Sequence, residues 1–329
     1  MSTRHLILIS TRPADHELAT SIARAASLSL AVVQEADQLI KHLYTGQESV
    51  VLWDIDNPET LEPGHSIAPE AVYPLLSGGL SPQRTFLLAD QGLNHQPELT
   101  QKSPSLKHRT WQHTLMRKIP ALCAVQYGRI LSFAFDPRPQ GLAPFFSPQT
   151  RIQKISLTRS EQRKAAADAM ESFLSKLGLE NRIASRAAQA TDELLMNAIF
   201  DAAVDASGNR TRNLLDRKAR FDFPPSEPVT IEAAEDESWV GLCATDRFGS
   251  VSIDSLFKYL GQNFHDLDYT PRKSGPGAGL GIYGIVESGF SLMHAFLPGK
   301  RTDSYVFIPK VKRYKDFRLN FHFTACFKA

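Results

Sequence analysis

Short apolar runs alternate with stretches of helical periodicity through the first 125 residues or so of the chain. The expected elements are strands at 5–9, 28–33, 50–53 and 85–88, and helices at 14–26 and 35–44. Strands that alternate with helices predict right-handed crossovers and a mostly parallel, doubly wound α/β sheet. After residue 85 the pattern weakens, and 129–135 is expected to be one more strand at a sheet edge.

A second pattern begins after an aperiodic, proline-rich segment at 136–150, which we expect to be a linker between domains. A strand at 151–156 precedes Thr158-Arg-Ser-Glu161, whose hydroxyl and carboxylate suit a capping box at a helix start. That helix is expected to end at Gly178, a residue suited to a left-handed C-cap. The elements expected next are a long helix at 181–203, a polar stretch at 205–227, and strands at 229–233 and 239–245.

The organisation predicted from these patterns is a domain at 1–135, the linker at 136–150, a second domain at 151–310, and a tail at 311–329. The tail mixes basic and aromatic residues. Its Leu319, Phe321 and Phe323 alternate with polar residues, as in a strand with one apolar face. We expect it to pack on the protein's own surface, with pairing to a partner chain or a second copy as the alternative.

Composition narrows the class of protein. Hydrophobic residues make up 42% of the chain and charged residues 22%, and the formal net charge is +2, an ordinary globular mixture. This balance gives no reason to expect nucleic acid or a membrane as the main partner. No apolar stretch suits a signal peptide or a membrane helix, and the cysteines Cys123, Cys243 and Cys326 are widely spaced. We therefore expect a cytoplasmic protein with reduced thiols.

A row of polar side chains on the expected helix at 181–203 is the first candidate for chemistry. Glu193, Asn197 and Asp201 fall at i, i+4 and i+8 and so share one helix face. A carboxylate and an amide side by side can hold Mg²⁺ and orient water, because that ion requires hard oxygen ligands. Taken alone, such a row is more often a solvated polar face.

Two further segments carry groups suited to a nucleotide. The strand at 239–245 leads to Asp246 and Gly249, where a carboxylate could accept a hydrogen bond from an adenine amino group, although an ordinary turn has the same pattern. A glycine-rich segment then leads into a helix, and its free backbone amides could converge on phosphate oxygens, with a flexible loop as the alternative. Its residues of interest are Gly275, Gly277, Gly279, Leu280 and Gly281.

In this order the segments resemble the GHKL (Bergerat-fold) ATPases, a family that includes gyrase, heat-shock chaperones, histidine kinases and mismatch-repair ATPases. Residues 193–197 resemble the N box of the family, 246–249 its G1 box and 277–281 its G2 box. Thr302, which precedes an apolar run at 304–309, resembles its closing threonine. The segment before the N box is most similar to the anti-sigma-factor serine kinases.

The resemblance implies an α/β sandwich that binds ATP with Mg²⁺. Asn197 would ligate Mg²⁺, Asp201 would lie beside it, and Glu193 would position water or assist proton transfer. Asp246 would recognise adenine, the glycines would wrap the phosphates, and 250–275 would form a lid over the nucleotide.

Two departures from the family pattern leave the activity open. Phe248 stands at the first glycine position of the G1 box, and Asp201 stands where the anti-sigma-factor kinases have histidine. The first hypothesis is a signalling protein, either monomeric or a homodimer, that uses Mg-ATP to phosphorylate a protein partner on serine or threonine. The alternatives are a pseudokinase that sequesters a protein partner and an ATP-driven conformational switch.

The N-terminal pattern resembles a response-regulator receiver domain, which has a flavodoxin-like fold, because Asp54 follows the third expected strand. In that family the aspartate accepts phosphate with the help of acids after the first strand, where this chain has Ser10 and Thr11. Ala89 stands where a receiver offers serine or threonine. We expect a degenerate receiver that serves for docking or dimerisation, with Asp54 as a minor candidate phosphoacceptor.

Overall fold

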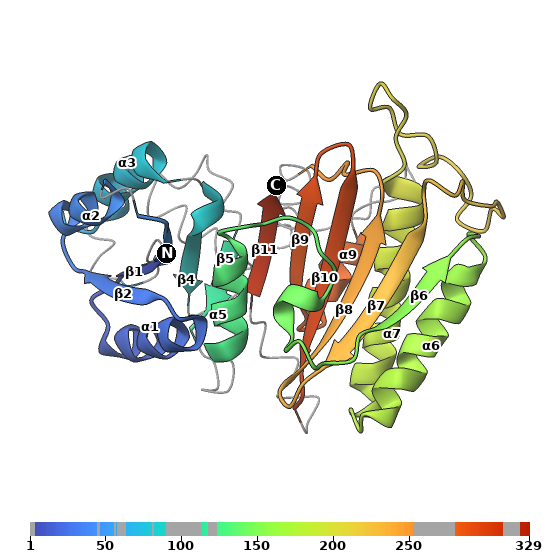
Figure 1. Cartoon of the computed structure of the whole chain (residues 1–329), viewed down its shortest axis with the longest axis horizontal. Coiled ribbons are helices and arrows are strands. Elements are labelled where there is room, and N and C mark those ends of the chain that lie inside the picture. The colour runs from blue at the N-terminus through green and yellow to red at the C-terminus, as the bar shows by residue number, and fades with distance from the viewer. Residues whose placement is uncertain are drawn as a thin grey trace, which may run out of the picture. The chain divides into compact units, whose positions relative to one another are not determined.

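The structure is a computed structural model that describes residues 4–44, 47–55, 57, 64–80, 82–89, 113–117, 124–252, 280–311 and 323–329. By their internal contacts the residues divide into two compact units (Figure 1). Unit 1 comprises Met1–Pro137 with His322–Phe327, and unit 2 comprises Arg138–Phe321 with Lys328–Ala329.

Unit 1 is built on a sheet in which β1 to β5 are parallel in the order β2-β1-β3-β4-β5 and β11 is antiparallel to β5. The strands are β1 (His5–Ile9), β2 (Ser29–Val33), β3 (Ser49–Asp54), β4 (Thr85–Ala89), β5 (His113–Met116) and β11 (Phe323–Lys328). The described helices are α1 (Pro13–Ala26), α2 (Ala36–Leu43), α3 (Pro69–Gly79) and α5 (Ala124–Phe133), with a short 3₁₀ turn, η1 (Pro82–Arg84). The predicted doubly wound, parallel α/β arrangement is therefore confirmed for the described strands.

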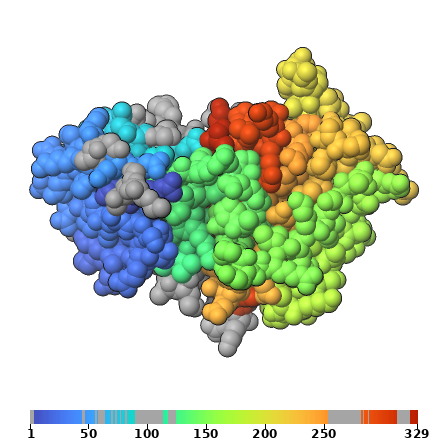
Figure 2. Space-filling model, in the orientation of Figure 1, coloured from blue at the N-terminus to red at the C-terminus, as the bar shows by residue number. Residues whose placement is uncertain are grey.

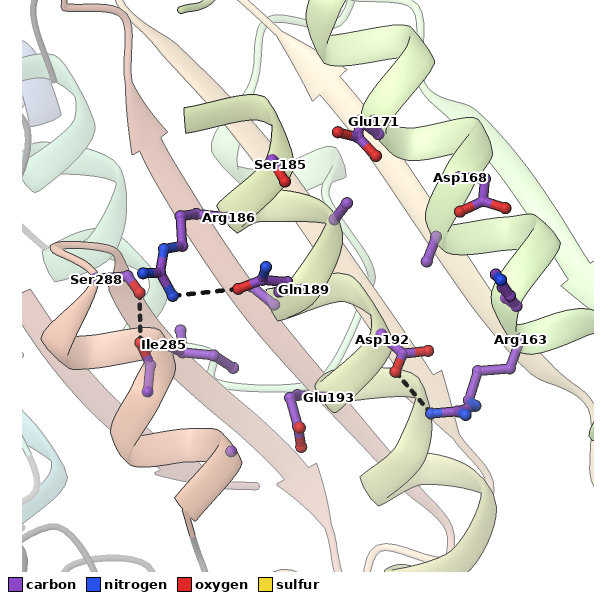
Figure 3. A pocket seen from close by; sticks show the side chains of 16 residues that line it. Arg163, Asp168, Glu171, Ser185, Arg186, Gln189, Asp192, Glu193, Ile285 and Ser288 are labelled. Atoms are coloured by element: carbon purple, nitrogen blue, oxygen red, sulfur yellow. Dashed lines mark hydrogen bonds and ion pairs between the residues drawn. The ribbon is translucent and has the colours of Figure 1, made fainter. Parts of the chain in front are cut away.

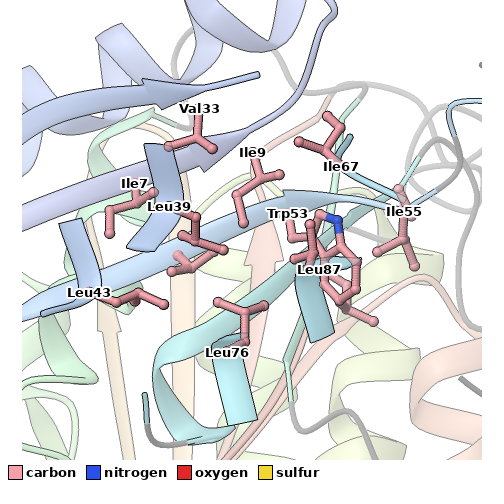
Figure 4. Close-up of a cluster of buried hydrophobic side chains, with 13 residues drawn as sticks. Ile7, Ile9, Val33, Leu39, Leu43, Trp53, Ile55, Ile67, Leu76 and Leu87 are labelled. Atoms are coloured by element: carbon pink, nitrogen blue, oxygen red, sulfur yellow. The ribbon is translucent and has the colours of Figure 1, made fainter. Parts of the chain in front are cut away.

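The main apolar core of unit 1 lies between its sheet and the helices α2 and α3 (Figure 4). Alternate residues of a strand point to the same face, so Ile7 and Ile9 of β1 lie beside Val51 and Trp53 of β3. The helices supply residues at i and i+4, namely Leu39 with Leu43 and Val72 with Leu76. This spacing in the sequence predicted α2, whereas α3 was not among the expected elements.

The prediction of a strand at 129–135 is wrong, because these residues belong mostly to α5. Tyr127, Ile130 and Leu131 are all buried, and their i, i+3 and i+4 spacing is that of a helix face. The last parallel strand is instead β5, and β11 comes from the end of the chain.

Unit 2 consists of an antiparallel sheet in the order β9-β10-β8-β7-β6 with a layer of helices on one face (Figure 1). The strands are β6 (Gln153–Leu157), β7 (Val229–Glu235), β8 (Trp239–Asp246), β9 (Ser291–Leu297) and β10 (Arg301–Pro309). The described helices are α6 (Gln162–Lys176), α7 (Asn181–Met196) and α9 (Leu280–Glu287), with a π turn, η6 (Asn197–Asp201), and a 3₁₀ turn, η5 (Ala143–Phe145). Between η6 and β7, residues 205–222 form a polar excursion that protrudes from unit 2 (Figure 2).

Residues 138–146, which the proline-rich pattern assigned to a linker, pack on the sheet of unit 2. The amide of Gly141 donates to the buried carboxylate of Asp303 at 2.7 Å, and the amide of Leu142 donates to Glu232 at 3.0 Å. The Phe145 ring packs edge-on against Tyr305 and Phe307 at centroid distances of 5.2 and 5.3 Å. The segment therefore belongs structurally to unit 2.

The start of α6 differs in detail from the predicted capping box. Gln162 takes the place assigned to Glu161, since its Oε1 accepts hydrogen bonds from the amides of Thr158 at 2.7 Å and Arg159 at 3.1 Å. An amide oxygen one residue further along can reach back to the same free donors. At the other end of this helix Gly178 has the predicted left-handed conformation, with φ of +75°.

Candidate functional site

The N-box-like residue Glu193 lies between α7 and the start of α9. A Cβ atom added at Gly281 would fall 2.0 Å from Glu193 Oε2, so the carboxylate lies directly against the glycine backbone. Both residues line a cavity of about 600 Å³ that α7 forms with its neighbours α6 and α9 (Figure 3). The structure thus brings together a predicted N-box residue and a predicted G2-box residue that are far apart in sequence.

The surroundings of Glu193 raise the pKa of its carboxyl group. Burial is the main cause, and the neighbouring charge of Asp192 acts in the same direction, while Arg163 and Arg217 oppose it. Arg163 is engaged with Asp192 at 2.7 Å. A carboxylate with a raised pKa is a better proton acceptor near neutral pH than an exposed one.

Asn197 begins the π turn η6, where the predicted continuous helix changes its winding. The amide of Ala202 donates to the carbonyl of Asn197 at 2.8 Å, an i to i+5 bond. Such π turns are found frequently at functional sites. The partly buried Asn197 remains one α-helical turn from Glu193, as predicted, whereas Asp201 forms an ion pair with Arg217 at 2.8 Å.

Asp246 is buried at the end of β8, where its Oδ1 accepts the amides of Phe248 at 2.8 Å and Gly249 at 3.3 Å. Burial raises its pKa to about 7 against the opposing effect of these amides. Thr302 pairs with Asp246 across the strands β8 and β10, and its hydroxyl lies close enough to lower that pKa. The Thr302 hydroxyl is buried and meets no partner at hydrogen-bond geometry among the described residues.

The turn after Asp246 depends on one glycine and one aromatic residue. Gly249 has φ of +59°, and a Cβ there would fall 2.1 Å from the Leu297 carbonyl oxygen. Phe248, at the first glycine position of the G1-like segment, packs against Ala202 and Ala203 at the end of η6 and is 8% exposed. Its ring therefore contributes to the core, which accounts physically for a phenylalanine at this position.

Part of the predicted site lies outside the described residues. This holds for Gly275, Gly277 and Gly279 and for the expected lid, of which only 250–252 are described. Leu280 begins α9, but its side chain is outside the description.

Two arginines of the polar excursion were not singled out by the sequence analysis. Besides its ion pair with Asp201, Arg217 lies over the Phe200 ring at 5.1 Å. Arg212 pairs with Glu227 at 2.5 Å and lies over the Phe248 ring at 5.7 Å. A stretch rich in arginine gives no indication in sequence of which aromatic or acidic residues its side chains will reach.

In unit 1, Asp54 lies in a buried cluster of charges at the carboxyl ends of the parallel strands. Its Oδ1 accepts from Arg117 Nη2 at 2.6 Å, and its Oδ2 lies 3.2 Å from both Arg12 Nε and Ser10 Oγ. Asp15, in the first turn of α1, pairs with Arg117 Nε at 2.5 Å and with Ser10 Oγ at 2.7 Å. Asp15 thus brings a second carboxylate into the cluster of Asp54 from the helix that follows the first strand.

None of the described helices is both long enough and apolar enough to cross a membrane.

Comparisons with known proteins add little to this description. No family model matches the sequence, and no curated protein matches it. Among solved structures, the chain is similar to full-length FixJ from B. japonicum, with 11% sequence identity and a TM-score of 0.28. The match covers 58% of this chain and 73% of that chain.

Proposed function

We propose that unit 2 is an Mg-ATP-binding domain of the GHKL kind and uses ATP to phosphorylate a protein partner on serine or threonine. The observation that carries this proposal is the contact between Glu193 and the backbone at Gly281. It joins the helix with the N-box-like residues to the helix that follows the glycine-rich segment. A two-layer domain with helices on one face of an antiparallel sheet agrees with the proposal.

The pair Asp246 and Thr302 fits an adenine base. Asp246 Oδ1 is engaged with two backbone amides, and the adjacent buried Thr302 hydroxyl acts on the Asp246 carboxyl without reaching full hydrogen-bond geometry to any described residue. A buried polar atom without a partner is costly, and a ligand that offers a donor and an acceptor would remove that cost. An adenine edge, with its amino group beside a ring nitrogen, has that chemistry.

Asn197 and Glu193 fit the phosphate end of the nucleotide. The amide oxygen of Asn197 is the type of ligand that Mg²⁺ accepts, and Glu193 lies against the start of α9. The helix start offers backbone amides and the positive end of the helix dipole to phosphate oxygens. Bound Mg²⁺ would neutralise phosphate charge, while the raised pKa of Glu193 suits it to accept a proton from an attacking hydroxyl.

Calorimetric titration with ATP, ADP and GTP, with and without Mg²⁺, tests the binding site. We expect adenine-selective binding that falls by roughly 10-fold or more in Asp246→Asn and in Thr302→Val, since each loses a hydrogen bond to the base. Asn197→Ala should lose the Mg²⁺ dependence of ATP binding. Asp222→Asn serves as the matched control, because that carboxylate is 80% exposed, and it should bind like the wild type.

Turnover separates catalysis from binding. Glu193→Gln should keep ATP affinity and lose ATP hydrolysis by roughly 100-fold or more, since proton transfer typically contributes that much. Equal affinity for ATP and GTP, or no binding at millimolar nucleotide, would contradict the proposed site. Binding without any Glu193-dependent turnover would replace the kinase proposal with a nucleotide-bound module that sequesters its partner.

A further inference from the structure

The buried charge cluster of unit 1 is complete without any added group. Asp15 and Asp54 are fully buried, and each of their four carboxylate oxygens has a partner among Arg12, Arg117 and Ser10. Arg117 bridges the two acids with one guanidinium nitrogen on each, and the Ser10 hydroxyl also lies between them. Among the described residues of this cluster, two positive and two negative charges therefore balance.

The cluster lies where ligands usually bind to parallel α/β sheets. Ser10 follows β1, Asp54 ends β3 and Arg117 follows β5, so the three lie at the carboxyl edge of a parallel sheet. In the strand order β2-β1-β3-β4-β5 the direction of winding reverses between β1 and β3, and ligands of such sheets bind at that edge. A pair of carboxylates there would otherwise suit a divalent cation.

We infer that Arg117 is a built-in cation of unit 1, which occupies the space between Asp15 and Asp54 and locks β5 against β3 and α1. Nitrogen–oxygen distances of 2.5 and 2.6 Å leave no room for a metal ion or a phosphoryl group between guanidinium and acid. The lock makes unit 1 independent of Mg²⁺ and closes Asp54 to phosphoryl donors.

The lock by Arg117 also affects β11. Arg117 directly follows β5, and β5 is the strand with which β11 pairs. β5 pairs with β11 through Leu115 with Phe323 and His113 with Ala325. The amide of Cys326 also donates to His113 Nδ1 at 3.3 Å. By fixing the position of β5, Arg117 also stabilises the pairing of β5 with β11.

Hydrogen exchange of the full chain, measured without nucleotide, tests the lock. In Arg117→Met a net negative charge is left buried, so amides of β3 and β5 should exchange roughly 100-fold faster or more, and β11 with them. Millimolar Mg²⁺ should restore much of that protection in Arg117→Met and change nothing in the wild type. Arg117→Lys should be intermediate, since one ammonium group cannot bridge two carboxylates with a planar fork.

The double variant Arg117→Met with Asp54→Asn is the matched control. It restores the charge balance, so we expect slower exchange than in Arg117→Met and no response to Mg²⁺. Wild-type exchange rates in Arg117→Met would overturn the inference. So would a Mg²⁺ response of β3 in the wild type that Asp54→Asn abolishes.

A measurement on the native chain remains decisive if Arg117→Met does not fold. Wild-type protein incubated with acetyl phosphate and Mg²⁺ should carry no acyl phosphate on Asp54, as read by mass spectrometry of the intact protein and its peptides. Phosphorylated Asp54 would show that the cluster opens to cation and donor, and the lock would be refuted.

Discussion

At the residue scale, Asp246 shows how burial sets the chemistry of a carboxyl group. Two backbone amides favour its charged form, yet burial prevails and raises the pKa to about 7. Because the folded pKa lies above the unfolded value, Asp246 opposes folding once it ionises. Its contribution to stability is fully present below the unfolded pKa and is lost as pH rises through about 7.

Asp246→Asn should therefore stabilise the nucleotide-free protein at pH 8 by roughly 2–4 kcal/mol, because the amide oxygen can keep both backbone hydrogen bonds without the buried charge. The measurement is urea unfolding at pH 8 and at pH 5. At pH 5 the folded carboxyl is mostly protonated while the unfolded one is already ionised, so the gain should shrink to roughly 1–2 kcal/mol. A gain of the same size at both pH values would mean that the charge is not the cause.

Gly281 gives a second prediction at this scale, with Gly284 as its control. Gly281→Ala should displace the Glu193 carboxylate and abolish ATP turnover, while stability changes little because the colliding atoms end a flexible side chain. Gly284 lies in the same helix and a Cβ there would meet nothing within 4 Å. Gly284→Ala should keep turnover and raise the free energy of unfolding by roughly 0.5–1 kcal/mol. Equal turnover in both variants would remove Glu193 from the proposed mechanism.

At the element scale, the effect of replacing a turn glycine in unit 2 depends on whether other backbone atoms lie against it. Gly249 and Gly299 both have positive φ, but only at Gly249 would a Cβ strike neighbouring backbone atoms. Gly299→Ala should cost roughly 1 kcal/mol for the strained conformation alone. Gly249→Ala should cost several times that, about 3 kcal/mol or more, since the Leu297 carbonyl cannot move without opening β9. Chemical unfolding of both variants measures the difference, and equal losses would show that the turn relaxes freely.

Local pattern predicted most elements, and its failures have physical causes. The left-handed Gly178 follows from a short-range rule that needs no tertiary contact, whereas the start of α6 was predicted only approximately, because Gln162 rather than Glu161 accepts the free amides. The helix at 124–133 was missed because apolar residues on its buried face also recur at every second position. That spacing is also typical of a strand. Periodicity cannot separate the two when the run is short and largely buried.

The candidate site likewise has features that the sequence could predict and features that it could not. The helical spacing of Glu193 and Asn197 and the strand end at Asp246 could be predicted, since each lies within one element. The ion pair between Asp201 and Arg217 and the packing of Phe248 could not, because they depend on how the excursion at 205–222 folds back. The charge cluster of Asp15, Asp54 and Arg117 likewise joins residues that only the sheet order brings together.

At the scale of the whole molecule, chain order and structural units do not coincide. The sequence pattern placed the end of the chain in a separate tail, yet His322–Phe327 belongs to unit 1. Leu319 and Phe321 lie outside the described residues, and the strand itself begins at Phe323. Unit 1 is therefore completed by β11, which follows the strands of unit 2 in the sequence.

Phe327→Ala should consequently destabilise unit 1, although the residue is only two positions from the end of the chain. Its fully buried ring stacks on His113 at 4.3 Å and meets Phe133 edge-on at 5.2 Å. Loss of such a ring typically costs about 3–5 kcal/mol, which should accelerate hydrogen exchange in β4 and β5. Lys328→Ala, at an exposed neighbouring position, should leave those rates near the wild-type values. If Phe327→Ala exchanges no faster than this control, unit 1 is stable without β11, and the C-terminal strand is free to serve another purpose.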